Sequence, residues 1–570
     1  MQLANGKFIG RAVGFGGIIE LEVEILDFKI QGIEILSHNE TKIISDPAFK
    51  YVPSNIVDLS SIFVPNVSGA SITSRAIKNA TIDALVQAGA NRDYLESQMI
   101  EAETLEKICE HQNVTLPSEV DIIVVGSGGA GLSAAISAAE NGRSVLLIEK
   151  MNTLGGNTLV SMGGVNIPMS DAQLASNIED SNDSFYEDIV AGGDNENILE
   201  QVDILVANAF DTYKWIKDFV GVNFKPTSMM HFGGHKVPRA TVFEGKYAIE
   251  LISKLRVKAQ ELGVRIVSGV KAKNLLVDEG KVRGIEVSYN EGICANIKTT
   301  KGVVLATGGF SSNVEMRMQY DKNLDTRYKT TNVSGVTGEG HIMAKEAGAK
   351  FVHMEHIQTF PISNPHTGEL SHIGGARFDG AILVNKQGER FVEELDRRDV
   401  VSEGILNQIG NIAYLVWSDE IESINNSIKN NKPELDRLNS DDLFMQADTV
   451  EEAAKFMGIN TQTLQHTIDK YNKFVENGHD EDFNRRGSLV PIKQAPFYIQ
   501  AVAPAVHHTM GGVAINSDMQ VLDMNDKPIE GLYAAGEIVG GTHGTNRLGG
   551  NAITEILVFG KIAGQKISQQ

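Results

Sequence analysis

Cysteine is almost absent from this chain of 570 residues. Its two cysteines, Cys109 and Cys294, stand in no CxxC or CxxCH spacing. This pattern excludes a disulfide framework and gives no sign of covalent haem, zinc or an iron–sulfur cluster. We therefore expect both thiols to be ordinary buried or surface side chains.

Basic residues are also scarce relative to acidic ones, with 51 Lys and Arg against 73 Asp and Glu and a net charge of -22. This balance disfavours nucleic acid and anionic membranes as partners, although it says little about small anions, which local charge can bind. The start of the chain has no basic segment leading into an apolar core, so no signal peptide is predicted. We expect a cytoplasmic protein of two or three domains without membrane insertion.

Glycine, in contrast, is abundant and forms the most informative motif. Gly126, Gly128 and Gly131 lie in GSGGAG, directly after the apolar run IIVV, and Glu149 closes a second run, VLLIE. The first glycine permits a tight strand-to-helix turn, the second lets a pyrophosphate approach the backbone, and the third lets the helix pack on the strand. The acid is placed to bind a ribose diol. This order of elements predicts a dinucleotide site. Residues 122–139 carry no charge and could be mistaken for a membrane span, but their glycines and serines fit the nucleotide-binding fold better.

Five further segments carry a family resemblance: LGGNTLVSMGG (154–164), ATGGF (306–310), HHTMGG (507–512), GLYAAGE (531–537) and GTNRLGGNA (544–552). In this order they resemble the flavoprotein family of the fumarate reductases and succinate dehydrogenases, and especially its soluble fumarate, urocanate and cinnamate reductases. The resemblance implies FAD. Because Asn157 stands where membrane-bound relatives often carry the histidine that links FAD covalently, we expect noncovalent FAD.

The resemblance also implies the residues that contact FAD. They are Gly126, Gly128, Ala130, Gly131, Glu149, Lys150, Gly155, Gly156, Asn157, Thr158, Gly163, Gly164, Thr307, Gly308, Glu537, Arg547, Ala552 and Ile553.

The first hundred residues form a separate unit. Residues 20–25 alternate Glu with apolar residues, as in a half-buried strand, and an apolar face predicts a helix over 73–88. Three segments, GFGG (14–17), ILSHNET (35–41) and SGASITS (68–74), resemble an FMN-binding module in which a flavin transferase joins FMN to a hydroxyl by a phosphoester.

Carried onto this chain, the FMN acceptor is Ser71. A hydroxyl on an exposed turn can receive the flavin phosphate, and Gly69 and Ala70 leave room for it. Alternatively, Ser71 or Thr73 is only the N-cap of the helix. The module usually has aspartate six residues before the acceptor, where this chain has Pro65, so recognition by the transferase is left open.

The resemblance implies the domain order and the fold class. We expect an FMN-binding module at 1–102 with an α+β fold, a polar linker at 103–118, and a Rossmann-like α/β FAD-binding domain at 119–353 and 507–570. A clamp domain is inserted at 354–506. A second nucleotide fingerprint is missing, because GVTGEGH (335–341) lacks the third glycine. Electrons are therefore expected from a partner reductase or flavoprotein rather than from NADH bound by this chain.

The reaction implied is the reduction of a double bond conjugated to a carboxylate. It requires hydride from flavin N5 to the β-carbon, cationic groups for the carboxylate, and a proton for the α-carbon. By resemblance, His507 and Arg547 bind the carboxylate, and Arg398 in ELDRRD (394–399) is the acid. Alternatively, Arg398 caps a helix.

An arginine acid needs a relay, because guanidinium is effectively never deprotonated in isolation. By resemblance, Arg377 belongs to this relay, together with a glutamate whose place is taken here by Gly374. Asp379 or Glu394 are candidates to replace that glutamate. Alternatively, Arg377 only pairs with a local acid.

Phe360 in QTFP (358–361) governs substrate choice. Fumarate reductases have histidine there for the second carboxylate, and a phenyl ring instead stacks on a flat apolar group. Urocanate reductases have tyrosine there, with the same 38-residue spacing to the acid, yet their imidazole-binding aspartate is replaced here by Gly375. Alternatively, Phe360 is a core residue.

We therefore expect a 2-enoate reductase for a monocarboxylate. A cinnamate-like aryl acid is favoured, followed by urocanate, then acrylate or methacrylate, with fumarate last. Two other classes stay open on the same fold. One is an oxidase or dehydrogenase, such as an aspartate oxidase or a ketosteroid dehydrogenase, and the other is a nonenzymatic electron carrier.

Overall fold

The computed structural model describes residues 3–40, 45–67, 70–102, 115–245, 248–289 and 292–570, with the backbone alone at 71 and 100–102. The chain forms two compact units. The first comprises Met1–Ile108, Thr326–Thr331 and Thr359–Val506, and the second comprises Cys109–Asp325, Asn332–Gln358 and His507–Gln570. Most of the expected linker at 103–118 lies outside the described residues.

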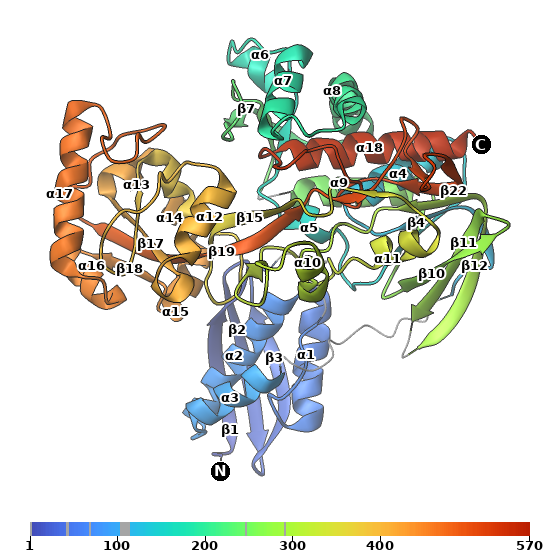
Figure 1. Ribbon diagram of the computed structural model, residues 1–570. Coiled ribbons are helices and arrows are strands. Elements are labelled where there is room, and N and C mark those ends of the chain that lie inside the picture. Colours follow the sequence, from blue (N-terminus) through green and yellow to red (C-terminus); the bar gives the residue numbers. More distant parts are fainter. Residues whose placement is uncertain (1–2, 41–44, 68–69, 103–114, 246–247, 290–291) are drawn as a thin grey trace. The chain divides into compact units, whose positions relative to one another are not determined.

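The first unit begins with a small α+β module, blue in Figure 1. Its sheet is an antiparallel meander in the order β1-β2-β3, and α1 and α2 pack against it. Gly10 on β1 permits this packing, because a Cβ there would lie 1.8 Å from the Ala80 carbonyl of α2. The elements are β1 (Gly6–Val13), β2 (Ile18–Leu26), β3 (Lys29–Ser37), α1 (Asp46–Leu59), α2 (Ser71–Gln87) and α3 (Arg92–Ala102).

The rest of the first unit is a sheet covered by short helices. Its strands follow the order β13-β19-β17-β16, and β15 and β18 also pair with β19. The first two residues of β15 and the last three of β19 belong to the second unit. The elements are β13 (Lys329–Thr330), β15 (Ile357–Ser363), the 3₁₀ helix η2 (Ile373–Asp379), β16 (Ile382–Val384), α12 (Arg398–Leu406), η3 (Ile409–Asn411), β17 (Ala413–Ser418), α13 (Asp419–Asn425), α14 (Ser427–Asn430), α15 (Lys432–Ser440), β18 (Phe444–Ala447), α16 (Val450–Met457), α17 (Thr461–Asn477) and β19 (Phe497–Thr509).

The second unit is built on a sheet in the order β10-β11-β12-β4-β5-β9, with β22 also parallel to β12. Strands β4, β5, β9 and the end of β12 run parallel, and the buried apolar runs of β4, β5 and the end of β12 explain why these three form the centre. The strands of this sheet and the helices near it are β4 (Glu119–Val125), α4 (Gly129–Glu140), β5 (Val145–Glu149), α9 (Ile249–Glu261), β9 (Arg265–Ser268), β10 (Lys271–Asp278), β11 (Lys281–Tyr289), β12 (Ile293–Leu305), β21 (Gln520–Leu522), β22 (Pro528–Ala534) and α18 (Asn551–Ser568).

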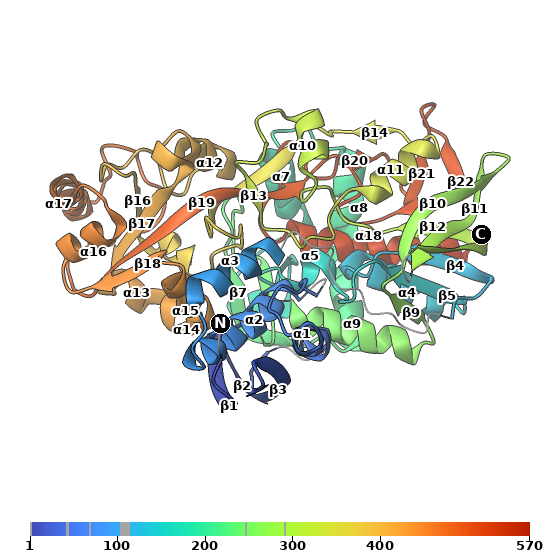
Figure 2. The ribbon, with the colours of Figure 1, turned by 90° about the horizontal axis from the view of Figure 1, so that it is seen from below.

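Helices α4 and α18 lie side by side in Figures 1 and 2. Two glycines of α18 make this close approach possible. A Cβ at Gly560 would lie 2.4 Å from the Ala130 carbonyl, and one at Gly564 would lie 2.2 Å from the Ala134 carbonyl. The middle of α18 is thereby held against the first two turns of α4, next to the glycine-rich loop.

The remaining elements of the second unit surround this core. They are α5 (Gly156–Leu159), β6 (Gly164–Asn166), α6 (Asp171–Ala175), α7 (Asn182–Gly192), α8 (Leu199–Lys214), the π-helix η1 (Trp215–Val220), β7 (Phe224–Met230), β8 (Ala240–Phe243), α10 (Val314–Tyr320), α11 (Glu339–Glu346), β14 (Phe351–Val352) and β20 (Gly512–Val513). Strands β6, β8 and β7 form a separate small sheet.

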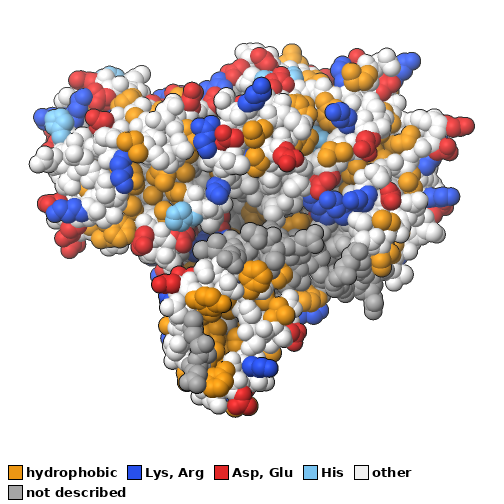
Figure 3. Space-filling view, turned by 60° about the horizontal axis from the view of Figure 1, so that its bottom comes forward, with side chains coloured by type: hydrophobic (Ala, Val, Ile, Leu, Met, Phe, Trp, Pro, Cys, Tyr) orange, Lys and Arg blue, Asp and Glu red, His pale blue; other side chains and the backbone are white. Residues whose placement is uncertain are grey.

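Charge is mixed on the surface that Figure 3 shows, where Lys and Arg side chains are interspersed with Asp and Glu. Among the described residues, no helix combines the length and the apolar character needed to cross a membrane. Cys294 is exposed, whereas Cys109 lies outside the described residues.

Candidate active site

The loop between β4 and α4 has the geometry of a dinucleotide turn. Gly126 has φ +103°, and a Cβ there would lie 2.3 Å from the Ala306 carbonyl. A Cβ at Gly131 would lie 1.9 Å from the Gly126 carbonyl, so only glycine lets the helix approach the strand. At Gly128, in contrast, a Cβ would meet nothing nearer than 3.8 Å, and this glycine lines a pocket in front of the helix N-terminus.

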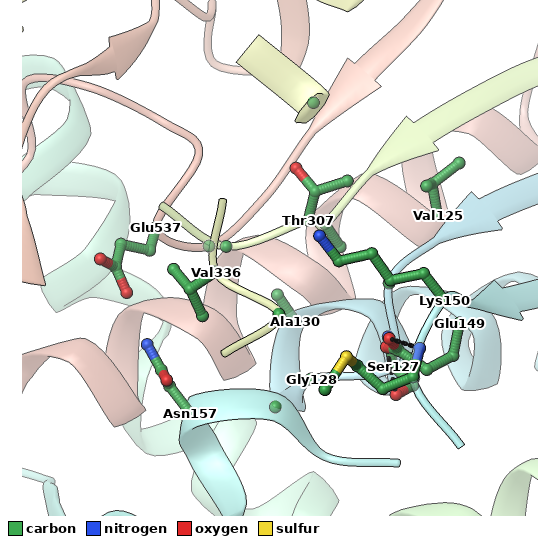
Figure 4. A pocket seen from close by; sticks show the side chains of 18 of the residues that line it. Val125, Ser127, Gly128, Ala130, Glu149, Lys150, Asn157, Thr307, Val336 and Glu537 are labelled. Atoms are coloured by element: carbon green, nitrogen blue, oxygen red, sulfur yellow. Dashed lines mark hydrogen bonds between the residues drawn. The ribbon is translucent and has the colours of Figure 1, made fainter. Parts of the chain in front are cut away.

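Glu149 closes one end of this pocket (Figure 4). At the end of β5, its carboxylate accepts hydrogen bonds from the Ser127 backbone N–H at 3.0 Å and hydroxyl at 2.7 Å, and from the Met151 N–H at 2.8 Å. Next to it, Lys150 Nζ lies 2.8 Å from Glu339. Burial alone would raise the pKa of Glu339, but the Lys150 charge and hydrogen bond lower it to about 2.

Asn157 and Glu537 lie at the opposite end (Figure 4). The Asn157 amide donates to Asn332, and its carbonyl oxygen accepts from the Val333 N–H at 3.0 Å. Glu537 accepts from the Thr509 N–H at 3.0 Å and hydroxyl at 3.1 Å. Burial raises the pKa of Glu537, and the Thr509 hydrogen bonds oppose this rise.

Most of the predicted FAD residues line this pocket, including Thr158, Thr307 and Gly308. The others do not line it. They are Gly131 inside α4, Gly155 at φ +109° before α5, Gly163 and Gly164 at the start of β6, Ala552 and Ile553 in the first turn of α18, and Arg547 in the loop before that helix.

The pocket fits FAD on two observations. The Thr307 hydroxyl is buried and has no hydrogen-bond partner among the described residues. Side chains would have open space at both Gly128 and Gly156, where glycine instead exposes the backbone to the pocket. A long cleft with a glycine-rich helix N-terminus and an acid at one end suits the phosphates and ribose of a dinucleotide.

Arg547 is buried in the second unit and is held mainly by Gln358. Its Nη2 donates to Gln358 Oε1 at 3.0 Å, and Gln358 Nε2 donates to the Arg547 carbonyl at 2.9 Å and to Asn546 Oδ1 at 2.5 Å. Burial lowers the pKa of Arg547 to about 10, and the Glu537 charge opposes this shift. His507 lies on β19, where its carbonyl accepts from Asn332 at 2.9 Å.

Two buried nitrogen atoms at this place, Nε of Arg547 and Nδ1 of His543, have no hydrogen-bond partner among the described residues. Burial, followed by the Arg547 charge, lowers the pKa of His543 to about 3, so this imidazole is neutral. A buried donor without an acceptor is costly, and an anionic ligand at this arginine would satisfy it.

In the first unit, Phe360 brings two predicted arginines together. The Arg377 guanidinium carbon lies 5.6 Å from the centre of the Phe360 ring, and that of Arg398 lies 5.3 Å from it. Phe360 is 7% exposed and belongs to the apolar core of this unit, as the core interpretation predicts, yet its ring also contacts both guanidinium groups.

Arg377 lies on η2 and is buried. Within the part of the chain that the structure describes, it forms no ion pair, and it packs on Phe378 at 4.7 Å as well as on Phe360. Burial first, and then the charge of Arg485, lower the pKa of Arg377 to about 10, while Glu393 opposes this. Arg398 is the first residue of α12, whose N-cap is Arg397.

The two carboxylates considered as relay substitutes are otherwise engaged. Glu394 is fully buried between Arg390 at 2.8 Å and Arg485 at 2.6 Å. Asp379 accepts a hydrogen bond from Asn425 at 2.7 Å. A side chain at Gly374 would lie 2.2 Å from Ile362, whereas one at Gly375 would have open space.

Ser71 is the first residue of α2, and its side chain lies outside the described residues. The N-cap of α2 is Ala70. The Thr73 hydroxyl donates to Glu40, which also accepts from the Gly16 N–H at 2.6 Å. Glu40 thus joins the GFGG loop to the first turn of α2.

Sequence reasoning missed three contributors: Gln358, His543 and Glu40. Gln358 stands inside the motif QTFP and His543 directly precedes GTNRLGGNA, so the neighbouring residues signalled the region but not these contacts. Glu40 stands in ILSHNET, and only the fold brings it to α2.

Comparison with known families agrees with this architecture. Residues 121–553 match the FAD binding domain family, and residues 14–86 match the FMN-binding domain family. The fold and the pocket therefore define a flavoprotein with one FAD-binding and one FMN-binding domain, which confirms both predicted cofactors.

The chain belongs to the flavoprotein family of the fumarate and urocanate reductases, which are flavin-dependent oxidoreductases. It is 37% identical to the urocanate reductase of Eggerthella lenta over 97% of this chain and 91% of that protein. Over the whole length of this chain, it is 32% identical to the NADH:acrylate oxidoreductase of Vibrio harveyi, of which the chain spans 62%. A flavocytochrome c3 fumarate reductase solved in an open conformation superposes with a TM-score of 0.70, at 34% identity over 84% of this chain and 81% of that one. The predicted fold class is thereby confirmed.

Proposed function

We propose that the chain is a flavin-dependent 2-enoate reductase for a monocarboxylate with a flat, apolar β-substituent. The observation that carries the proposal is the contact of Phe360 with both Arg377 and Arg398. A reductase for a dicarboxylate needs a donor at this place, and phenylalanine offers none. An aryl acid can stack on the ring instead.

His507 and Arg547 bind the substrate carboxylate in this proposal. The buried Arg547 is fixed by Gln358 and keeps an unpaired Nε–H, as an anion-binding group requires. Fixed donors in a site from which water is excluded stabilise the charge that develops on the carboxylate during reduction. FAD, when bound, supplies the hydride from N5 to the β-carbon.

Arg398 gives the proton to the α-carbon, and Arg377 returns a proton to Arg398. The shared contact with Phe360 and the depressed pKa of Arg377 support this pair. An ordinary guanidinium is a very weak acid, and burial makes loss of its proton easier.

The N-terminal module carries FMN in a phosphoester at Ser71, attached by a flavin transferase, and FMN passes electrons from a partner reductase or flavoprotein. Support comes from the FMN-binding domain match and from the position of Ser71 at the start of α2. The cytoplasmic location and the domain limits remain predictions from the sequence.

Urocanate is the second candidate substrate, and one observation favours it: the E. lenta relative named urocanate reductase is similar over 97% of this chain. Against it stands Gly375, which offers no side chain to an imidazole.

The test is flavin reoxidation under anaerobic conditions. The protein is reduced with dithionite or a viologen and mixed separately with cinnamate, 4-hydroxycinnamate, urocanate, acrylate and fumarate. We expect rapid reoxidation by an aryl monocarboxylate and slow reoxidation by fumarate. Absence of reoxidation by all five acids would refute the proposal and favour the carrier or oxidase classes.

A variant tests the pocket itself. Phe360→His introduces a donor, so the ratio of fumarate to cinnamate activity should rise. Phe360→Leu, which has the same apolar character but no donor, is the matched control and should lower both activities without favouring fumarate. If neither variant changes the ratio, Phe360 does not face the substrate.

A further inference from the structure

A proton-donating arginine pair works only once unless a third group resupplies it. Arg377 is 5% exposed, so bulk water reaches it poorly. Position 374 is glycine and supplies no carboxylate, and a Cβ there would lie 2.2 Å from the Ile362 side chain. The resupplying group must therefore come from another element.

Glu393 is the carboxylate that acts on Arg377. It is 8% exposed and precedes α12 by five residues. It is the carboxylate whose charge opposes the fall in the Arg377 pKa that burial causes. Its neighbour Glu394 is instead engaged in buried ion pairs with Arg390 and Arg485.

Two consecutive residues join Glu393 to Arg377. The Arg485 guanidinium donates to the Arg377 carbonyl. The next residue, Arg486, binds the Glu393 carboxylate twice, through Nε at 3.0 Å and through its backbone N–H at 3.4 Å. The segment 485–486 thus holds Glu393 and the backbone of Arg377 together.

Glu393 also has a route to solvent. The Arg486 side chain that covers it is 62% exposed, and its Nη2 donates to Asp396, itself partly exposed. The Leu395 N–H at 2.9 Å completes the partners of the carboxylate. The charged groups that face Glu393 are thus Arg486, Arg377 and, beyond Arg486, Asp396.

We infer that Glu393 carries protons from solvent to Arg377 and so restores the acid form of Arg398 after each turnover. This inference rests on the proposed function, since it needs Arg398 as the proton donor. In each cycle Arg398 loses one proton to the α-carbon and regains one from Arg377. Arg377 takes one from the Glu393 carboxyl group, and the carboxylate left behind takes one from water. No oxidant or reductant takes part in these four proton transfers.

The test separates the first turnover from later ones. The fully reduced protein is mixed with an enoate, and flavin reoxidation is followed in stopped flow, while steady-state turnover is measured with reduced viologen. In Glu393→Gln, Arg398 begins protonated, so the first reoxidation should keep the wild-type rate. Steady-state kcat should fall by roughly 100-fold, as loss of a proton-transfer group does, and Glu393→Asp should recover much of it.

Glu389→Gln is the matched control, because it removes an exposed carboxylate of the same segment that accepts a hydrogen bond from Asn385 instead. We expect kcat close to wild type. If Glu389→Gln lowers kcat as much as Glu393→Gln, or if Glu393→Gln slows the first turnover equally, Glu393 is structural and the inference fails. A wild-type protein whose flavins no enoate reoxidises would instead refute the proposed function.

Discussion

Gln358 determines how well Arg547 can bind an anion, and its replacement gives the sharpest prediction. Gln358 is 4% exposed and makes three hydrogen bonds to Arg547 and Asn546. Gln358→Leu keeps the volume but leaves the Arg547 Nη2 without this acceptor, beside an Nε that already lacks one. An unpaired buried donor costs about 1–3 kcal/mol. At about 2 kcal/mol, kcat/KM should fall about 30-fold, since 1.36 kcal/mol is tenfold.

The assay is steady-state enoate reduction with a reduced viologen. The loss should appear chiefly as a higher KM, because Arg547 binds the carboxylate in the ground state as well as in the transition state. Gln408→Leu is the control, since Gln408 is half-buried and bonds only to residues of the first unit. If Gln358→Leu retains kcat/KM within twofold of wild type, Arg547 does not bind the substrate carboxylate.

Three further predictions address other parts of the chain. Gly375→Asp should be tolerated and should raise the ratio of urocanate to cinnamate activity, because a side chain at 375 has open space. Gly374→Ala should instead lower the free energy of unfolding by about 1–3 kcal/mol, because its Cβ clashes with Ile362. Equal stability of the two variants in a denaturant titration would contradict this difference. Ser71→Ala should remove the mass of FMN from the denatured chain in mass spectrometry and leave releasable FAD unchanged. Burial, and to a smaller extent the charge of Glu537, raises the pKa of Glu555 to about 8, although the hydrogen bond from the Gly536 N–H lowers it. The folded state therefore keeps a proton on Glu555 that the unfolded state loses above pH 4.5. The folded protein therefore loses stability as pH rises from about 4.5 to 8. Glu555→Gln removes this loss, because glutamine does not titrate. The Tm of the variant should exceed that of wild type by more at pH 8 than at pH 5.

The nucleotide site was predictable because its signals are local. Gly126, Gly128 and Gly131 act through backbone geometry within six residues, and β4, α4 and β5 follow directly in the chain. The buried strand pattern around them predicts a parallel sheet without further information. Family and cofactors followed from motifs whose order the sequence displays, and the comparisons confirm both.

Contacts between distant segments were not predictable in the same way. Gln358 and Arg547 are 189 residues apart, and nothing in either motif indicates that one fixes the other. The meeting of Arg377 and Arg398 on one phenyl ring likewise depends on the path of η2 and α12. The sequence offers residue types, and only the fold decides which of them share an environment.

The adjacent acids Glu393 and Glu394 illustrate this limit most clearly. The relay interpretation named Asp379 or Glu394 as the substitute carboxylate and did not consider Glu393. The fold gives the two side chains different partners. Glu394 lies in a buried site and forms ion pairs with two arginines. Glu393 lies beneath a single arginine, Arg486, whose side chain is exposed to solvent. A proton carrier needs the second environment, and a structural anchor needs the first. The neighbour that the motif did not mark is therefore the better candidate for the relay.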